Sequence, residues 1–288
     1  MASKTELKNI HQSTYPAISP KRPELSTKGK NALITGGASG IGASISKAFA
    51  ESGITNLAIL GRTEKTLQEQ KKQIETLHPE TTVWTYAVDV TNGNATASAV
   101  KSFATSVHGK IDILIANAGY MAALGSVTES DPEDWWQGFE ISVRGNFNLL
   151  RAFQPFAAKQ ATVIHISTIA VHLPYMEGYS SYRASKIAAH KMFEYYQGEN
   201  PDFTVIQVHP GLIAGTEMTK RFGASVAEWG LAYDDAALSG DFVVWAASEE
   251  AKFLNGRFVW ATWDVDELKA MKAELKTDGS RFTLGVHN

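Results

Sequence analysis

Short apolar runs alternate with amphipathic stretches along most of this chain, and this alternation restricts the fold more than any other feature of the sequence. Each apolar run has the length and aliphatic content of a strand buried on both faces. The runs lie at 31–34, 57–60, 83–88, 111–116, 162–166, 204–208 and 258–260. Because parallel strands need long crossover connections, strands that alternate with helices indicate a parallel sheet. The sequence therefore predicts an α/β fold, a doubly wound parallel sheet of about seven strands with helices on both faces.

The stretches between the runs have the spacing of helices that bury one face. The expected helices cover 41–52, 64–77, 95–108, 132–153, 182–196 and 235–248. No internal repeat or low-complexity tract interrupts this pattern, so we expect a single domain over residues 29–262.

The two ends of the chain do not follow the pattern. Residues 1–28 form an arm whose Tyr-Pro and Ser-Pro steps favour extended backbone, and the sequence leaves open whether this arm packs on the domain. Residues 263–288 form a tail, in which Asp264 and Glu267 are typical of a helix start. This final helix is expected to end at about Lys276.

Composition excludes several classes of site. The chain has no cysteine, which excludes disulfides, thiolate metal sites and a cysteine nucleophile. Its formal net charge of −3 gives no electrostatic reason to expect nucleic acid or an anionic membrane as a partner. No apolar run approaches the ~20 residues of a membrane-spanning helix, and the eight histidines show no metal-binding spacing. We therefore expect a cytoplasmic protein without a metal.

A glycine-rich turn follows the first predicted strand. The segment 35–42 reads Thr-Gly-Gly-Ala-Ser-Gly-Ile-Gly and leads directly into the first predicted helix. Glycines allow the backbone to approach a pyrophosphate, and the helix N-terminus supplies N–H donors and partial positive charge. A glycine-rich turn alone is a weak signal, but at the first strand–turn–helix of a doubly wound sheet it indicates a Rossmann-type dinucleotide site.

Four ordered motifs give the chain a resemblance to a known family. They are Thr-Gly-x-x-x-Gly-Ile-Gly at 35–42, Asn-Ala-Gly at 117–119, Tyr-x-x-x-Lys at 182–186 and Pro-Gly at 210–211. Together they resemble the short-chain dehydrogenase/reductase family over about residues 29–262. The two ends of the chain are similar to a branch common among fungal members, which implies secondary metabolism.

The resemblance implies an oxidoreductase that interconverts a ketone and a secondary alcohol. Tyr182 would be the acid/base, Lys186 would lower its pKa and bind the nicotinamide ribose, and Thr168 would orient the substrate oxygen. Tyr182 and Lys186 are four residues apart and therefore share a helix face. An adjacent ammonium favours the phenolate over the phenol, whose ordinary pKa is near ~10.

Two positions depart from the family pattern. The family usually has serine where this chain has Thr168, and Ser167 is the alternative if the register is shifted by one residue. An asparagine that holds a relay water in the family is replaced by Ser142, which has one hydroxyl instead of an amide. Asn146, one helical turn later, is a candidate to compensate. The two departures leave open how efficient redox turnover is.

Cofactor preference depends on the residues after the second strand. NAD-binding members carry an aspartate where this chain has Gly61, and Arg62 and Thr63 follow it. An arginine here pairs with a ribose 2′-phosphate, so NADP(H) is favoured and NAD(H) remains an alternative. The resemblance implies that the cofactor is held by Thr35, Gly36, Ser39, Gly40, Ile41, Gly42, Arg62, Thr63, Asp89, Val90, Asn117, Ala118, Gly119, Arg144, Tyr182, Lys186, Pro210, Gly211, Ile213 and Thr216.

Three predicted loops around the catalytic tyrosine are rich in apolar residues, which favours a bulky, apolar small-molecule substrate. The third of them is an expected lid over about 212–236. The candidates are Tyr120, Met121, Leu124, Leu173, Tyr175, Met176, Met218, Phe222, Trp229, Leu231 and Tyr233. Arg221 is the one obvious cation among them, and His172 is the histidine closest to the expected site.

Two other functions remain open from the sequence. One is a cyclase, isomerase or dehydratase that uses this fold with little or no net redox. The other is a sensor or scaffold that binds NADP(H) without turnover, although such a protein has no chemical need of Tyr182 and Lys186. The family resemblance also implies a homodimer or homotetramer.

Overall fold

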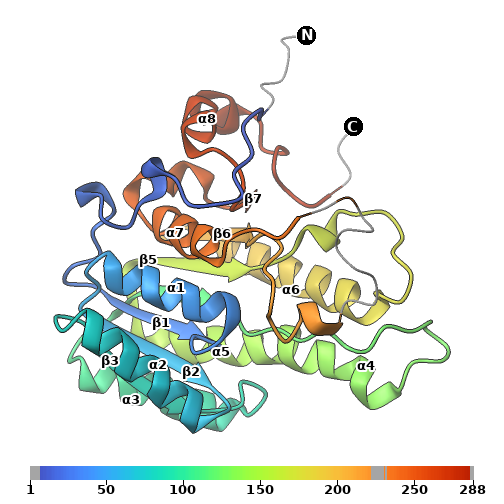
Figure 1. The fold of residues 1–288 in the computed structure, drawn as a ribbon, viewed down its shortest axis with the longest axis horizontal. Coiled ribbons are helices and arrows are strands. Elements are labelled where there is room, and N and C mark those ends of the chain that lie inside the picture. The colour runs from blue at the N-terminus through green and yellow to red at the C-terminus, as the bar shows by residue number, and fades with distance from the viewer. Residues whose placement is uncertain (1–6, 222–229, 231, 286–288) are drawn as a thin grey trace.

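The seven predicted strands form one parallel sheet in the order β3-β2-β1-β4-β5-β6-β7 (Figure 1). The protein is described by a computed structural model over residues 7–221, 230 and 232–285. The strands are β1 (Asn31–Thr35), β2 (Asn56–Gly61), β3 (Thr82–Ala87), β4 (Ile111–Ala116), β5 (Ala157–Ile166), β6 (Thr204–His209) and β7 (Phe258–Trp260). This confirms the predicted α/β class. The order of the strands reverses between β1 and β4, and doubly wound sheets bind ligands at such a switch point.

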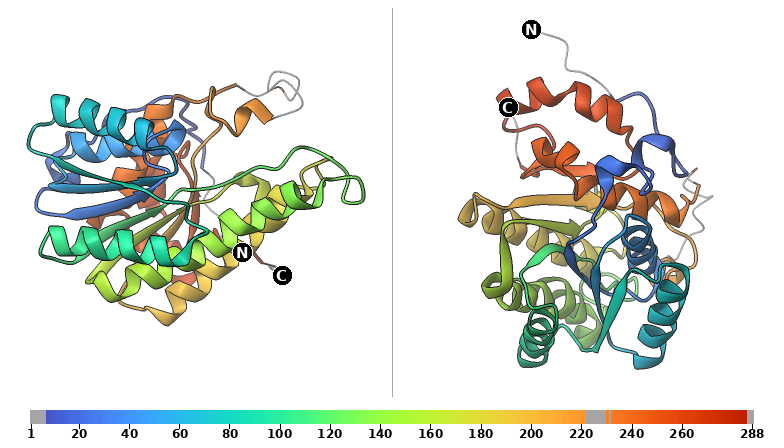
Figure 2. Two further views of the ribbon diagram at one scale, coloured as in Figure 1. Left: turned by 90° about the horizontal axis from the view of Figure 1, so that it is seen from below. Right: turned by 90° about the vertical axis from the view of Figure 1, so that its left-hand side faces the viewer.

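Helices cover both faces of the sheet, as Figure 2 shows from two directions. The α-helices are α1 (Gly40–Glu51), α2 (Glu64–Leu77), α3 (Gly93–Ser106), α4 (Pro132–Phe139), α5 (Asn146–Phe153), α6 (Ser180–Glu199), α7 (Ala236–Ala246), α8 (Val265–Ala270) and α9 (Lys272–Thr277). Two short 3₁₀ turns precede the sheet, η1 (Pro16–Ile18) and η2 (Pro23–Leu25). Others follow within the domain: η4 (Gln154–Phe156), η5 (Ile169–Val171), η6 (Thr219–Arg221) and η8 (Glu249–Leu254).

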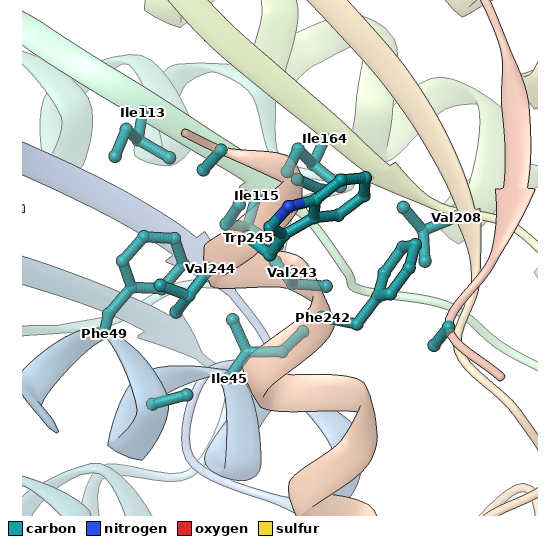
Figure 3. Close-up of a cluster of buried hydrophobic side chains, with 14 of the residues drawn as sticks. Ile45, Phe49, Ile113, Ile115, Ile164, Val208, Phe242, Val243, Val244 and Trp245 are labelled. Atoms are coloured by element: carbon teal, nitrogen blue, oxygen red, sulfur yellow. The ribbon is translucent and has the colours of Figure 1, made fainter. Parts of the chain in front are cut away.

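Successive residues of each central strand enter different cores. In β1, Ala32 and Ile34 pack with α1, α2 and α7, whereas Leu33 packs with α3, α5 and α6. Figure 3 shows the first core, in which Phe49 and Trp245 fill the space between α1, α7 and the sheet. Because both faces are buried, the strands are continuously apolar rather than alternating, which is the pattern found in the sequence.

The single helix expected over 132–153 is interrupted. A π-helical segment, η3 (Glu140–Gly145), separates α4 from α5. The wider turn shifts the backbone hydrogen bonds, and hydrophobic periodicity does not report such a local insertion. Gly145 lies at its end, where a Cβ would come within 2.6 Å of Val90 Cγ2, so only glycine fits.

The arm packs on the domain over its described residues, 7–28. His11 bonds Asp264 at 2.8 Å, and the Tyr15 hydroxyl donates to Trp263 O and accepts from Val265 N. The described part of the arm therefore lies beside the segment that leads into α8 (Figure 1). The expected final helix is divided at Met271 into α8 and α9.

Asp264 caps α8 as expected, accepting hydrogen bonds from two backbone N–H groups of its first turn. The carboxylate of Glu267, which the sequence suggested as part of the helix start, instead binds Lys8 N and the Asn9 side chain. The C-terminal helix is thus also the partner of the arm.

Candidate active site

The glycine-rich turn joins β1 to α1 and is shaped so that side chains are excluded from it. Gly36 and Gly40 have φ angles of +67° and +50°, which side-chain-bearing residues rarely adopt. A Cβ on Gly42 would lie 2.1 Å from Gly36 O. Helix α1 begins at Gly40, and Ser39 makes no side-chain capping bond there. The turn, together with Ile41, therefore forms an open cradle of the kind that fits a pyrophosphate at a helix N-terminus.

Thr35 and Asn117 support this turn from below. The buried Thr35 hydroxyl accepts hydrogen bonds from Asn117 N and Ala118 N, both at 3.0 Å, and the Asn117 amide donates to Thr35 O at 2.9 Å. These bonds tie the end of β1 to the end of β4. Gly119 follows, and a Cβ there would come within 3.2 Å of Lys186 Nζ.

The expected adenine end of the site lies beside the ends of β2 and β3. Arg62 and Thr63 are exposed directly after β2. Asp89 is half-buried after β3, and its Oδ1 accepts hydrogen bonds from the backbone and hydroxyl of Thr91. Val90 packs against Gly145 of the π-helical segment. The structure thus brings the four predicted residues to one edge of the sheet.

Tyr182 and Thr168 meet although they are 14 positions apart in the sequence. Tyr182 lies in the first turn of α6 and is 8% exposed, and the Thr168 side chain hydrogen-bonds its hydroxyl. Thr168 also caps η5 by accepting from Ala170 N at 3.2 Å. Ser167 points instead to His190 of α6, at 3.4 Å. The alternative register is therefore not the one adopted.

Burial dominates the titration of Tyr182 and Lys186. Desolvation raises the pKa of Tyr182 to about 12, opposed by the hydrogen bond from Thr168 and reinforced by Tyr179. Desolvation also lowers the pKa of Lys186 to about 8. Lys186 Nζ donates to Ile166 O at 2.9 Å. The ammonium thus binds the end of β5, and burial rather than Lys186 sets the pKa of Tyr182 in this structure.

Ser142 lies within the π-helical segment and is fully buried. Its hydroxyl has no hydrogen-bond partner among the described residues, whereas its backbone carbonyl accepts from Asn146 Nδ2 at 2.7 Å. Arg144, two residues later, is exposed and pairs with Glu140 at 3.0 Å. Asn146 therefore serves the backbone of the π-helical turn.

The segment after β6 returns the chain to the glycine-rich turn. Pro210 is buried, and Gly211 has a φ of +91° beside Asp234. Ile213 is buried and forms an isolated bridge with Asp234. The Thr216 side chain lies over Gly40, 3.3 Å from where a Cβ would be. The start of the expected lid is thus held close to the cradle.

An apolar cluster surrounds the Tyr182 ring and is built from the three predicted loops. Its members are Met121, Ala170, Tyr179 and Tyr182, with Leu124, Met176 and Met218 packed against them. Tyr175 is instead 85% exposed, and Tyr233 is 44% exposed. The candidates Phe222, Trp229 and Leu231 lie outside the described residues.

Two arginines hold the loops around this cluster; the sequence singled out Arg221 as a cation near the site but indicated the loop contacts of neither. Arg221 donates to Tyr120 Oη at 2.9 Å and to Met121 O at 2.8 Å, and Tyr120 also donates to Asp134 of α4. Arg183 donates to the carbonyls of Ala170, Leu173 and Pro174. Both arginines order loops through contacts between distant residues, which no local pattern records.

His172 packs its ring 4.8 Å from that of Phe258 on β7. Among the described residues, no group of three or more histidine, aspartate or glutamate side chains is arranged to hold a metal ion. In the same part of the chain, no helix has the length and apolar character needed to cross a membrane.

Comparison with known proteins agrees with this geometry. The family model for short chain dehydrogenases matches residues 30–227. A short chain dehydrogenase/reductase of Claviceps purpurea is 36% identical and covers 97% of this chain and 93% of its own. One from Aspergillus novofumigatus is 32% identical and covers 97% and 96%.

A solved structure shares the fold as well. A Burkholderia cenocepacia short chain dehydrogenase in complex with NADP superposes with a TM-score of 0.72 at 25% identity, covering 81% of this chain and 96% of its own. The strand order, the cradle after β1, the Tyr182–Lys186 pair and these likenesses agree. The chain belongs to the short-chain dehydrogenase/reductase family.

Proposed function

We propose that this protein is an NADP(H)-dependent oxidoreductase that interconverts a ketone and a secondary alcohol on a bulky, largely apolar small molecule. The observation that carries the proposal is the contact between Tyr182 and Thr168 inside an apolar cluster, at the end of the sheet where the cradle lies. Two hydroxyls in an apolar surrounding suit recognition of one substrate oxygen.

The chain's own residues supply the proton in this reaction. In ketone reduction, Tyr182 donates its hydroxyl proton to the substrate oxygen as that oxygen gains negative charge, and Thr168 donates a hydrogen bond to the same oxygen. In alcohol oxidation, the Tyr182 phenolate takes the proton back. The bound nicotinamide would supply or accept the hydride at the substrate carbon. Lys186, four residues after Tyr182 on α6, supplies a positive charge near the end of β5.

The residues around the cradle support binding of a dinucleotide. The N–H groups at the start of α1 suit the pyrophosphate, and the half-buried carboxylate of Asp89 after β3 is the proposed partner of the adenine. Gly61 contributes no carboxylate and Arg62 is exposed beside it, which favours a 2′-phosphate over a free 2′-hydroxyl. NADP(H) is therefore the preferred cofactor in this proposal.

A homo-oligomer through α4, α5 and α6 is part of the proposal. These helices carry exposed aromatic side chains, Trp136, Phe147 and Tyr195, that are 57%, 50% and 74% exposed. Large exposed apolar residues of this kind favour an interface. Light scattering of the purified protein tests it, and a monomer at micromolar concentration would contradict it.

The test of the proposed function has two stages. The first is fluorescence titration with NADPH and NADH, and the second follows the absorbance of the reduced nicotinamide with a panel of bulky apolar ketones. We expect preferential NADPH binding and oxidation, and Tyr182→Phe should lower turnover ~10³-fold or more while NADPH still binds. Tight binding without oxidation by the wild type would instead favour non-redox chemistry or a sensor.

A further inference from the structure

A buried polar cluster lies under α6, next to the residues of the proposed reaction. His165 on β5 is opposite Gln207 on β6, and its Nδ1 is 2.8 Å from Gln207 Oε1. Gln207 Nε2 donates to the carbonyl of His190 at 3.1 Å. Because the amide nitrogen is used there, the amide oxygen faces His165, and Nδ1 must carry the ring proton.

The other ring nitrogen of His165 is a buried acceptor. Burial, together with the neighbouring Lys186 charge, lowers the pKa of His165 well below its usual value, so the ring is neutral and Nε2 has a free lone pair. Nε2 has no hydrogen-bond partner among the described residues, and His165 is fully buried. An acceptor left unpaired in this way is costly.

A second unpaired atom lies on the same face of the sheet. The His165 ring stacks on Phe193 of α6 at 4.3 Å, and its Nδ1 faces β6, so Nε2 is directed away from β6. The sheet order places β4 on that other side of β5. Ser142, whose buried hydroxyl is also unpaired, lies in η3, which packs against α6. Buried waters in proteins typically bond about three polar groups that lack a protein partner, and both of these atoms are of that kind.

Lys186 supplies the remaining partner. Its ammonium has three N–H donors, and one of them binds the carbonyl of Ile166, the residue after His165. An acceptor beside the other donors would stabilise the ammonium and fix its direction.

We propose that His165 is a positioning residue for Lys186, in which Nε2 accepts a hydrogen bond from a buried water that also binds Lys186 Nζ and the Ser142 hydroxyl. The water accepts a hydrogen bond from the Lys186 ammonium and donates one to Nε2, so the donor and the acceptor are both paired. The link keeps Lys186 charged and directed at the reacting end of the sheet. The inference rests on the proposed function in one respect: it takes from it the role of Lys186 as a cation beside Tyr182.

The first experiment does not depend on finding a substrate. In protein labelled with ¹⁵N-histidine, the His165 signals, assigned by their loss in His165→Phe, should show a protonated Nδ1 and a bare Nε2. Lys186→Met should move the Nε2 resonance and leave the Nδ1 resonance in place. Ser142→Ala should also move the Nε2 resonance. This second variant keeps the test valid if Lys186→Met does not fold. A proton on Nε2, or an Nε2 resonance that neither variant moves, overturns the inference.

The second experiment uses turnover. His165→Phe keeps the stacking on Phe193 but removes both nitrogens, and the double variant with Gln207→Met also removes the amide left without a partner. Both should reduce ketones about tenfold more slowly with NADPH affinity retained. Their rate should begin to decline at a lower pH than in the wild type, because the ammonium has lost a stabilising neighbour.

A purely structural role for His165 would lower the melting temperature and leave that pH unchanged, which contradicts the inference. If no ketone is turned over by the wild type, the proposed function fails, and the NMR result still decides the role of His165.

Discussion

The side-chain amide of Asn146 donates a hydrogen bond to the backbone carbonyl of Ser142, 2.7 Å away. Both residues are buried, and the bond spans the junction between the π-helical segment and α5. A π-helical turn displaces backbone carbonyls from their usual helical donors. Asn146 thus supplies a side-chain donor to a buried backbone carbonyl of the irregular turn.

Asn146→Leu should therefore destabilise the fold. The substitution keeps the branched shape and the number of side-chain heavy atoms but leaves the Ser142 carbonyl without this donor. A buried carbonyl that loses its partner costs about 1–3 kcal/mol in the free energy of unfolding. Urea denaturation measures the change. Equal midpoints for variant and wild type would mean that the carbonyl has another partner.

Ser142→Asn should accelerate ketone reduction. The serine hydroxyl is buried without a protein partner, and an amide offers both donor and acceptor groups at the same place. We expect a gain of about tenfold, equivalent to ~1.4 kcal/mol in the activation free energy. Initial rates of NADPH oxidation with one ketone compare the two forms. Absence of redox in both would favour a non-redox activity.

Ketone reduction should fall as the pH rises through about 8. Burial lowers the pKa of Lys186 to about 8, so its positive charge is present below that pH and lost above it. Tyr182, whose pKa is raised to about 12, stays protonated over the same range. Lys186→Arg provides the control, because a guanidinium stays charged and should extend activity to higher pH. A wild-type rate that is constant up to pH 10 would refute this assignment.

Substitutions at the end of β2 should change the preference for NADPH over NADH. Arg62→Gln should weaken NADPH binding by about tenfold and leave NADH binding nearly unchanged, because only NADPH has a phosphate for the guanidinium. Gly61→Asp should further favour NADH, since a carboxylate bonds the free ribose hydroxyl and repels the phosphate. Fluorescence titrations of both cofactors measure the ratio. Equal losses for the two cofactors would place Arg62 outside the phosphate site.

Asp241→Asn should stabilise the protein at neutral pH. Burial raises the pKa of Asp241 to about 6 from 3.8, so the folded state holds its proton more tightly than the unfolded state. This contribution favours folding at low pH and is lost as the pH rises through about 6. The amide needs no proton and still accepts from Thr14, its partner in the arm. We expect a gain of roughly 1–2 kcal/mol at pH 7.5 and none below about pH 3, where both states are protonated, measured by denaturant unfolding.

The sequence was sufficient to predict the sheet, because apolar runs buried on both faces indicated β1 to β7. The motifs selected Tyr182 and Thr168, which the structure brings into contact, and their roles stay predictions. Such features are local, because each depends on a strand, a turn or one helix face.

Contacts between distant residues could not be predicted in this way. Nothing in the neighbourhood of Arg183 or Arg221 indicates which carbonyls they bind, because those partners are chosen by the tertiary fold. The π-helical turn could not be predicted either, because one extra residue in a helix changes the spacing of the apolar residues very little. The pKa of Tyr182 was expected to reflect a neighbouring cation, but its depth in the apolar cluster has the larger effect.

The pairing of the arm with α8 has a consequence for the order in which the molecule folds. Lys8 contacts Glu267, which is 259 positions later, so the arm is synthesised long before the helix that binds it. Contacts of such long sequence separation form late, after the intervening chain has become compact. The arm therefore has no docking site while the intervening residues are being made, and we expect it to attach only after the sheet has formed.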